Sequence, residues 1–140
     1  MIHMVSSRST SLPRSFWRLV ALALFWEGLP PGVYFLFAGN LGWGILLTVF
    51  GLASMLVALS ETFLRWAESR VVYRPLGILL MVYLVLLIPV EIWIAIGAGR
   101  YDPQVQPLMF LHLSVYLGLA VLTIWSYRRS LADGRLAPRM

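Results

Sequence analysis

The sequence predicts an all-α integral membrane protein, a four-helix bundle whose first helix is kinked or broken at Pro30-Pro31. Two observations predict this class. Hydrophobic residues make up 60% of the 140 residues and charged residues only 12%, whereas about a quarter of the residues of soluble domains are charged. The segment from Pro75 to Ala98 is apolar with Glu91 as its single charge, and as a helix it is long enough to cross a hydrocarbon core of about 30 Å.

The composition also excludes several classes of function. Cysteine is absent, so the chain forms no disulfide framework and has no thiolate nucleophile. The net charge of +5 comes from arginines that lie in short clusters between apolar runs, a pattern typical of membrane topology signals rather than nucleic-acid binding. We find no glycine-rich phosphate loop, zinc-binding helix or nucleophilic serine turn, and we therefore predict no catalytic residue, no metal and no cofactor.

The predicted domain organisation is a membrane domain between two tails. A Ser-rich cytoplasmic tail covers 1–12, the four-span domain covers 13–127, and a basic cytoplasmic tail covers 128–140. Glycine, proline and charged residues separate the apolar runs. The predicted spans are 13–38, 41–62, 75–98 and 107–127.

The first helix contains a proline pair that favours a bend or a break. Pro30 and Pro31 lack a backbone N–H, so the carbonyls of Trp26 and Glu27 lose their usual helical partners. Either the helix runs bent to about Ala38, or it ends early and a short interfacial piece follows. Trp26 would suit the outer aromatic belt only if the helix ended early, which favours the broken version.

The second helix carries a row of small residues with helical spacing. Such a face lets another helix approach closely. Packing within the chain is the simpler interpretation, and a seam between copies of the chain is the alternative. The predicted packing residues are Gly44, Gly51, Ser54 and Ala58.

The arginines predict the orientation of the chain in the membrane. With four spans, ten of the eleven arginines fall on one side, and Arg100 alone lies on the other. Because positive charge collects in cytoplasmic segments, both termini are expected in the cytoplasm. We therefore predict a multi-pass protein of the bacterial inner (plasma) membrane.

The third and fourth helices place two ionisable residues at similar depth. Glu91 lies about 24 Å along its helix from the inner side at about 1.5 Å per residue, and His112 lies about one turn into the next, antiparallel helix. Helices joined by a short loop usually pack together, so these side chains are expected to meet, with Glu27 joining them if the first helix is broken. Tyr116 lies on the same face as His112.

The chemistry of this predicted intramembrane polar site stays open at this stage. Glu27, Glu91 and His112 could relay protons, hold a metal or bind a cationic ligand. A hydrogen bond that only fixes the register of the helices is the simpler interpretation.

The stretch Leu86–Trp93, with Pro89 and Glu91, resembles the Pro-Phe-Glu-Ile-Tyr signature of a domain-of-unknown-function family of small predicted four-helix bacterial membrane proteins. The Trp66-Ala67 pair resembles the Arg-Trp-Ala loop of that family. Val90 stands where the family has Phe, and Trp93 where it has Tyr. The resemblance implies a four-span layout and signature roles for Pro89 and Glu91, and no activity.

Two functions agree with these features, and a third class, an enzyme that handles a lipid or quinone substrate, has little support in the sequence. The first is an accessory or scaffold subunit of a larger membrane assembly, because the chain is small and has short loops. The alternative is a small oligomeric transporter or proton-coupled carrier that uses Glu27, Glu91 and His112. The expected partners are the lipid bilayer and other membrane subunits or further copies of the chain, without nucleic acid.

Overall fold

The computed structural model describes residues 11–136, so 1–10 and 137–140, which belong to the predicted tails, lie outside the described residues. The described chain is all α-helical, as predicted. Four of its helices are long and apolar enough to cross a membrane, which makes the protein a multi-pass membrane protein in contact with lipid. The elements are α2 (Arg14–Phe37), α3 (Leu41–Leu59), α4 (Glu61–Glu68), the short helical turn η1 (Val71–Tyr73), α5 (Arg74–Tyr101) and α6 (Gln106–Leu136).

Two boundaries differ from the predicted ones. The second predicted span ran to residue 62, but α3 ends at Leu59 and a separate short helix, α4, begins at Glu61. Ser60 causes this division because its side chain accepts a hydrogen bond from the backbone N–H of Phe63 at 3.2 Å, which caps the new helix. The fourth helix continues to Leu136, so the segment predicted as a tail from residue 128 begins as helix.

The first long helix is not broken. The helix α2 runs continuously from Arg14 to Phe37 with Pro30 and Pro31 inside it, so the version that ends early and supplies a short interfacial piece is wrong. Prolines are tolerated in membrane helices where neighbouring groups satisfy the carbonyls that they free. A side chain of α6 does this for Trp26, as described below.

Helices α2 and α3 pack through glycines on both sides. All four predicted packing residues of α3 are buried, and α2 contributes Gly28 and Gly32, a Gly-x-x-x-Gly pair absent from our prediction. A Cβ on Gly28 would lie 2.8 Å from the backbone N of Gly51, and one on Gly51 would overlap the backbone of Leu29. The small residues therefore bring two backbones into direct contact within one chain.

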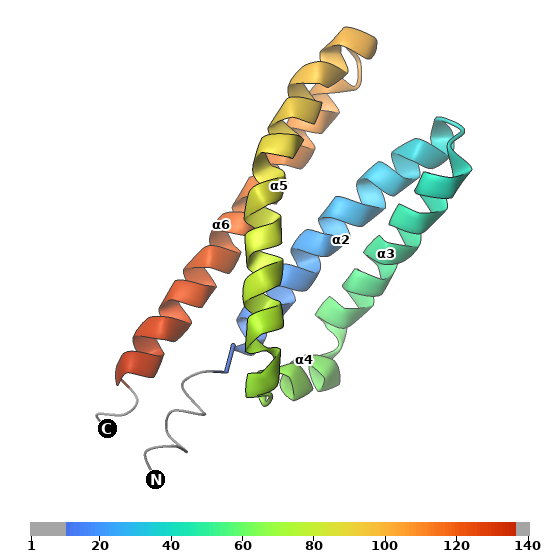
Figure 1. The fold of residues 1–140 in the computed structure, drawn as a ribbon. Coiled ribbons are helices and arrows are strands. Elements are labelled where there is room, and N and C mark those ends of the chain that lie inside the picture. The colour runs from blue at the N-terminus through green and yellow to red at the C-terminus, as the bar shows by residue number, and fades with distance from the viewer. Residues whose placement is uncertain (1–10, 137–140) are drawn as a thin grey trace.

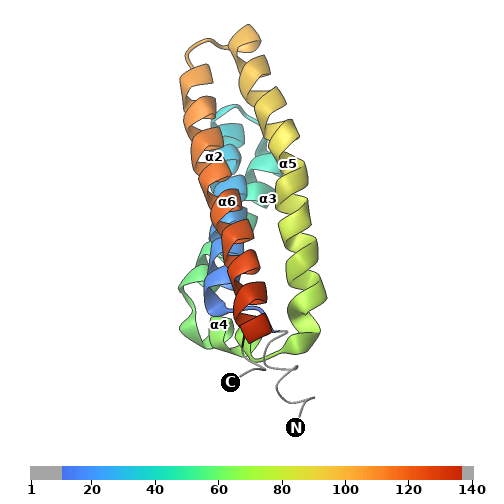
Figure 2. The ribbon, with the colours of Figure 1, turned by 90° about the vertical axis from the view of Figure 1, so that its left-hand side faces the viewer.

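The four long helices form two antiparallel hairpins. Helices α2 and α3 make the first hairpin and α5 and α6 the second, and Figure 1 shows the two hairpins diverging towards the loop between α5 and α6. Figure 2 shows α2 lying behind α6 and beside α5, with α3 further away. The buried core lies nearer the opposite end, between α2, α4, α5 and α6, and includes Phe16, Leu64, Leu84 and Tyr116.

The short helix α4 is tied to the beginning of α2 by ion pairs. Arg14 approaches Glu68 at 2.9 Å and Glu61 at 3.4 Å, and Arg18 also pairs with Glu61. These side chains are 38–54% exposed, so each pair contributes about 0.2–1 kcal/mol at most. The pairs add to the packing of Leu64 and Ala67 in the core, and α4 lies at the same end of the molecule as the beginning of α2 (Figure 1).

Candidate functional site

Three ionisable side chains from three membrane-spanning helices converge in the structure. Glu27 comes from α2, Glu91 from α5 and His112 from α6, and each lies inside a segment long and apolar enough to span the membrane. One ligand atom from each side chain lies within 4.8 Å of the other two. We call these three residues the Glu27–Glu91–His112 cluster.

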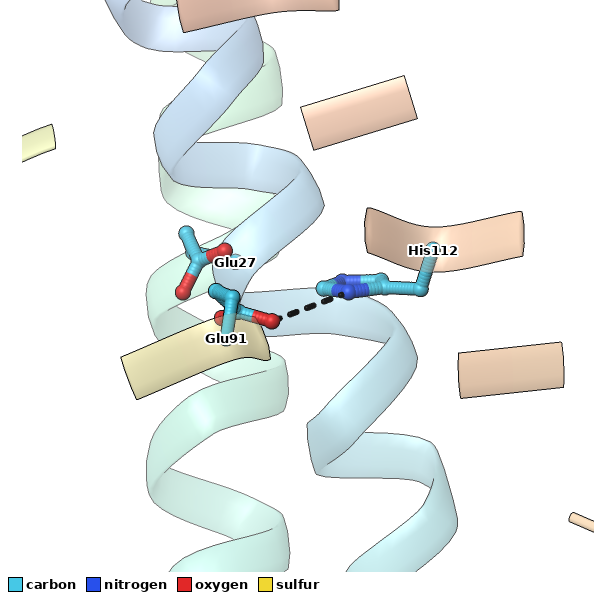
Figure 3. A group of neighbouring side chains, drawn as sticks. All are labelled: Glu27, Glu91 and His112. Atoms are coloured by element: carbon cyan, nitrogen blue, oxygen red, sulfur yellow. Dashed lines mark ion pairs between the residues drawn. The ribbon is translucent and has the colours of Figure 1, made fainter. Parts of the chain in front are cut away.

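Within the cluster, Glu91 lies between the other two side chains. Its Oε2 is 3.5 Å from Nδ1 of His112, and the two side chains are only 12% and 10% exposed. Figure 3 shows the carboxylate of Glu91 pointing towards the imidazole, with Glu27 on its other side. Each side chain is positioned by a different helix, so the cluster joins the two hairpins.

Trp26 holds His112 in place from the neighbouring helix. The indole stacks on the imidazole with ring centroids 5.2 Å apart and planes inclined by 13°. The indole Nε1 donates a hydrogen bond to the backbone carbonyl of His112 at 2.9 Å. Trp26 is therefore a positioning residue of the cluster rather than an anchor in the outer aromatic belt.

The carbonyl that Pro30 frees orients the imidazole. Nε2 of His112 lies 2.7 Å from the backbone oxygen of Trp26, which is the carbonyl that a residue with an N–H at position 30 would use in a regular helix. A carbonyl oxygen only accepts hydrogen bonds, so Nε2 carries the proton and donates. In the neutral ring Nδ1 is then a lone-pair nitrogen, and it faces Glu91.

Glu27 brings a buried oxygen that has no partner in the described part of the chain. Its Oε1 is fully buried and forms no hydrogen bond there. We expected Glu27 to reach the cluster only if the first helix broke, and that premise is wrong, because the continuous helix places it there. Two carboxyl groups and one imidazole lie together where a buried charge costs at least about 2.5 kcal/mol.

Tyr116 lies next to the cluster but its hydroxyl is used elsewhere. The side chain is fully buried, and its hydroxyl donates to the backbone carbonyl of Leu84 on α5. This bond ties α5 to α6 about two helical turns before Glu91. Thr123, further along α6, is also buried and donates to the carbonyl of Leu119 at 2.7 Å.

Comparison with known proteins finds no matching family model, no similar curated protein and no similar solved structure. The resemblance to the family with the Pro-Phe-Glu-Ile-Tyr signature therefore stays a prediction.

The geometry of the cluster is suited to binding a positive charge. Two carboxylates and a lone-pair nitrogen present electron-rich atoms to a common point, and a cation at that point would neutralise the carboxylates in a medium of low dielectric constant. A hydrogen bond that only fixes helix register needs one donor and one acceptor. Glu91 and His112 already meet that requirement, so a bond of this kind does not account for the second carboxylate, Glu27.

Proposed function

We propose that this protein is a small membrane carrier that binds a cation at the Glu27–Glu91–His112 cluster. The observation that supports the proposal is the meeting of two carboxylates and an imidazole from three membrane-spanning helices, with ligand atoms within 4.8 Å. Ionisable residues inside membrane helices are expensive to keep there and commonly mark ion or proton pathways.

The position of the cluster between the hairpins supports a carrier. Glu27 belongs to the first hairpin, and Glu91 and His112 belong to the second, so a small movement of one hairpin against the other would change the cation site. Sites between two moving bundles are the usual arrangement in carriers. Four helices enclose little space, so we propose that the carrier works as an oligomer.

The orientation proposed for the carrier places both termini in the cytoplasm of a bacterial inner membrane. The arginine distribution supports it. In Figure 1, α4, the beginning of α2 and the end of α6 lie at one end of the molecule, and the two hairpins diverge at the other end.

Transport in vesicles tests this proposal. The purified protein is reconstituted into liposomes that contain a pH-sensitive dye or a metal-sensitive dye, and proton and Zn²⁺ uptake are measured in parallel. Uptake of either cation that is lost in Glu91→Gln and kept in Glu68→Gln supports a carrier. The proposal is contradicted if neither protons nor Zn²⁺ are taken up, or if the two variants take up a cation equally.

An accessory subunit of a larger membrane assembly is the second candidate. The exposure of apolar side chains on α5, including Leu79, Leu86 and Trp93, leaves room for another membrane protein as well as for lipid. Purification from the native membrane in mild detergent separates the candidates. A stoichiometric partner of different sequence supports the subunit role, and an oligomer of this chain alone supports the carrier.

A further inference from the structure

We infer that the Glu27–Glu91–His112 cluster binds one divalent transition-metal ion through a carboxylate oxygen of Glu27, a carboxylate oxygen of Glu91 and Nδ1 of His112. This inference rests on the proposed function, because it names the class of cation that the carrier takes. Four features of the cluster support it: the orientation of the histidine, the unpartnered oxygen of Glu27, the balance of charge and the spacing of the ligand atoms.

The histidine is oriented as a metal-binding histidine is. Metal-binding histidines almost always donate their second ring N–H to a carbonyl or carboxylate, which fixes the ring and the tautomer. Nε2 of His112 donates to the carbonyl of Trp26 at 2.7 Å, and the stacked indole of Trp26 restricts rotation of the ring. The remaining nitrogen, Nδ1, points into the cluster at 3.5 Å from Glu91.

Glu27 supplies an acceptor that lacks a donor. Its Oε1 is buried and forms no hydrogen bond within the described chain, although buried polar atoms are nearly always paired. Leaving such an atom without a partner costs about 1–3 kcal/mol or more for a charged group. A metal ion bound between the carboxylates would satisfy this oxygen.

The charge of a divalent ion matches that of the cluster. In the metal-bound state, two ionised carboxylates and a neutral imidazole would carry two negative charges, which a divalent cation cancels. Without a metal ion, Glu91 faces Nδ1 of His112 at 3.5 Å, a contact that is an ion pair only when the imidazole is protonated, so a metal ion at Nδ1 would displace that proton. Within 11–136 no ion pair is described for Glu27. A metal ion would therefore convert two buried carboxylates into a neutral site, which lowers the cost of holding them in the membrane.

The ligand types and spacing fit a transition metal better than an alkaline-earth metal. Imidazole nitrogen suits Zn²⁺, Fe²⁺, Ni²⁺ and similar ions, whereas Mg²⁺ and Ca²⁺ take oxygen ligands. Bonds of about 2.0–2.2 Å in a tetrahedral site set ligand atoms roughly 3.4 Å apart. Ligand atoms within 4.8 Å of one another reach that spacing by small side-chain rotations, and a position stays open for water or release.

Cobalt binding tests the inference without any measurement of transport. The protein is purified in detergent, treated with chelator and titrated with Co²⁺, whose visible absorption is strong in a tetrahedral site and weak in water. Because the chain has two histidines, His3, which lies outside the described residues, is replaced by Ala so that His112 is the single one. We expect one Co²⁺ per chain, displaced by Zn²⁺.

Conservative variants locate the bound ion. Glu27→Gln, Glu91→Gln and His112→Gln should each weaken Co²⁺ binding by at least about 100-fold, since loss of an outer-shell partner alone costs 10–100-fold. Glu68→Gln, on α4, makes the same change outside the cluster and should leave binding unchanged. Circular dichroism and size-exclusion chromatography check that each variant folds. A second measurement needs no ligand variant: Co²⁺ should raise the melting temperature of the protein in which Glu27, Glu91 and His112 are intact.

The possible outcomes separate this inference from the proposed function. Folded protein that binds no Co²⁺ and shows no thermal shift, or binding that persists in all three ligand variants, overturns the metal site. Proton uptake that depends on Glu91 would then still support the proposed carrier function. Co²⁺ bound at the cluster without uptake of any cation into liposomes supports the metal site and overturns the carrier.

Discussion

Trp26 and His112 exchange hydrogen bonds, each side chain donating to the backbone carbonyl of the other. The indole Nε1 is 2.9 Å from the carbonyl of His112, and Nε2 of the imidazole is 2.7 Å from the carbonyl of Trp26. The second of these bonds uses a carbonyl that Pro30 has freed from the helix. The proline therefore helps to build the site, because it supplies an acceptor that a regular helix would have occupied.

Restoring the helical hydrogen bond at this proline should loosen the site. In Pro30→Ala the new N–H competes with His112 for the carbonyl of Trp26, so we expect about 10-fold weaker Co²⁺ binding with helicity kept or increased. The matched control is Pro31→Ala, whose restored bond would go to the backbone carbonyl of Glu27. This carbonyl, unlike the Glu27 side chain, has no described role in the cluster. Equal affinity of Pro30→Ala and the natural chain would contradict the orienting role of this carbonyl.

Removing the indole N–H should destabilise the contact between α2 and α6. Trp26→Phe keeps an aromatic ring beside His112 but loses the bond to its carbonyl, so the free energy of unfolding in micelles should fall by about 0.5–1.5 kcal/mol. Trp93→Phe is the control, because Trp93 is 76% exposed. The two variants are compared by denaturation in mixed micelles, and equal stability would argue against a structural role of the bond.

A methyl group on the glycine face should separate α2 from α3. Gly51→Ala places a Cβ against the backbone of Leu29, and overpacking of this kind costs about 1–3 kcal/mol. Gly118→Ala is the same substitution at a position with nothing within 4 Å, where it should be neutral or gain up to about 1 kcal/mol of helix propensity. Thermal unfolding in detergent compares the two, and a Gly51→Ala protein as stable as Gly118→Ala would refute the packing.

The orientation can be measured with single cysteines, since the natural chain has none. Ser69→Cys lies after α4, and Gln104→Cys lies in the loop between α5 and α6. An impermeant thiol reagent added to intact cells should label Gln104→Cys and should label Ser69→Cys only after lysis. The reverse pattern would invert the proposed topology.

The features predicted correctly from the sequence are those that depend on one helix or on two helices joined by a short loop. The length of apolar runs predicted the membrane-spanning helices, and helical spacing predicted the buried face of α3. Counting the depth of Glu91 and His112 from the loop between their helices placed them at one level, and the structure has them 3.5 Å apart.

The features that sequence reasoning missed depend on how distant helices rotate against each other. The donor that compensates Pro30 is His112, which bonds to a residue 86 positions away in the chain. Local rules left a bent helix and a broken helix open and favoured the broken one, whereas the structure has a continuous helix. The role of Trp26 was missed for the same reason. The Gly28 and Gly32 pair could have been found, since Gly-x-x-x-Gly is a known packing pattern of membrane helices.

The most direct test of a single shared cation site is a double-substitution experiment across the two hairpins. Cation uptake into liposomes is measured for Glu27→Gln, His112→Gln and the protein that carries both substitutions. Residues that act as one unit are strongly non-additive, so each single substitution should abolish uptake and the double substitution should be no worse. Uptake that survives either single substitution, or partial losses that multiply in the double variant, would contradict a shared site.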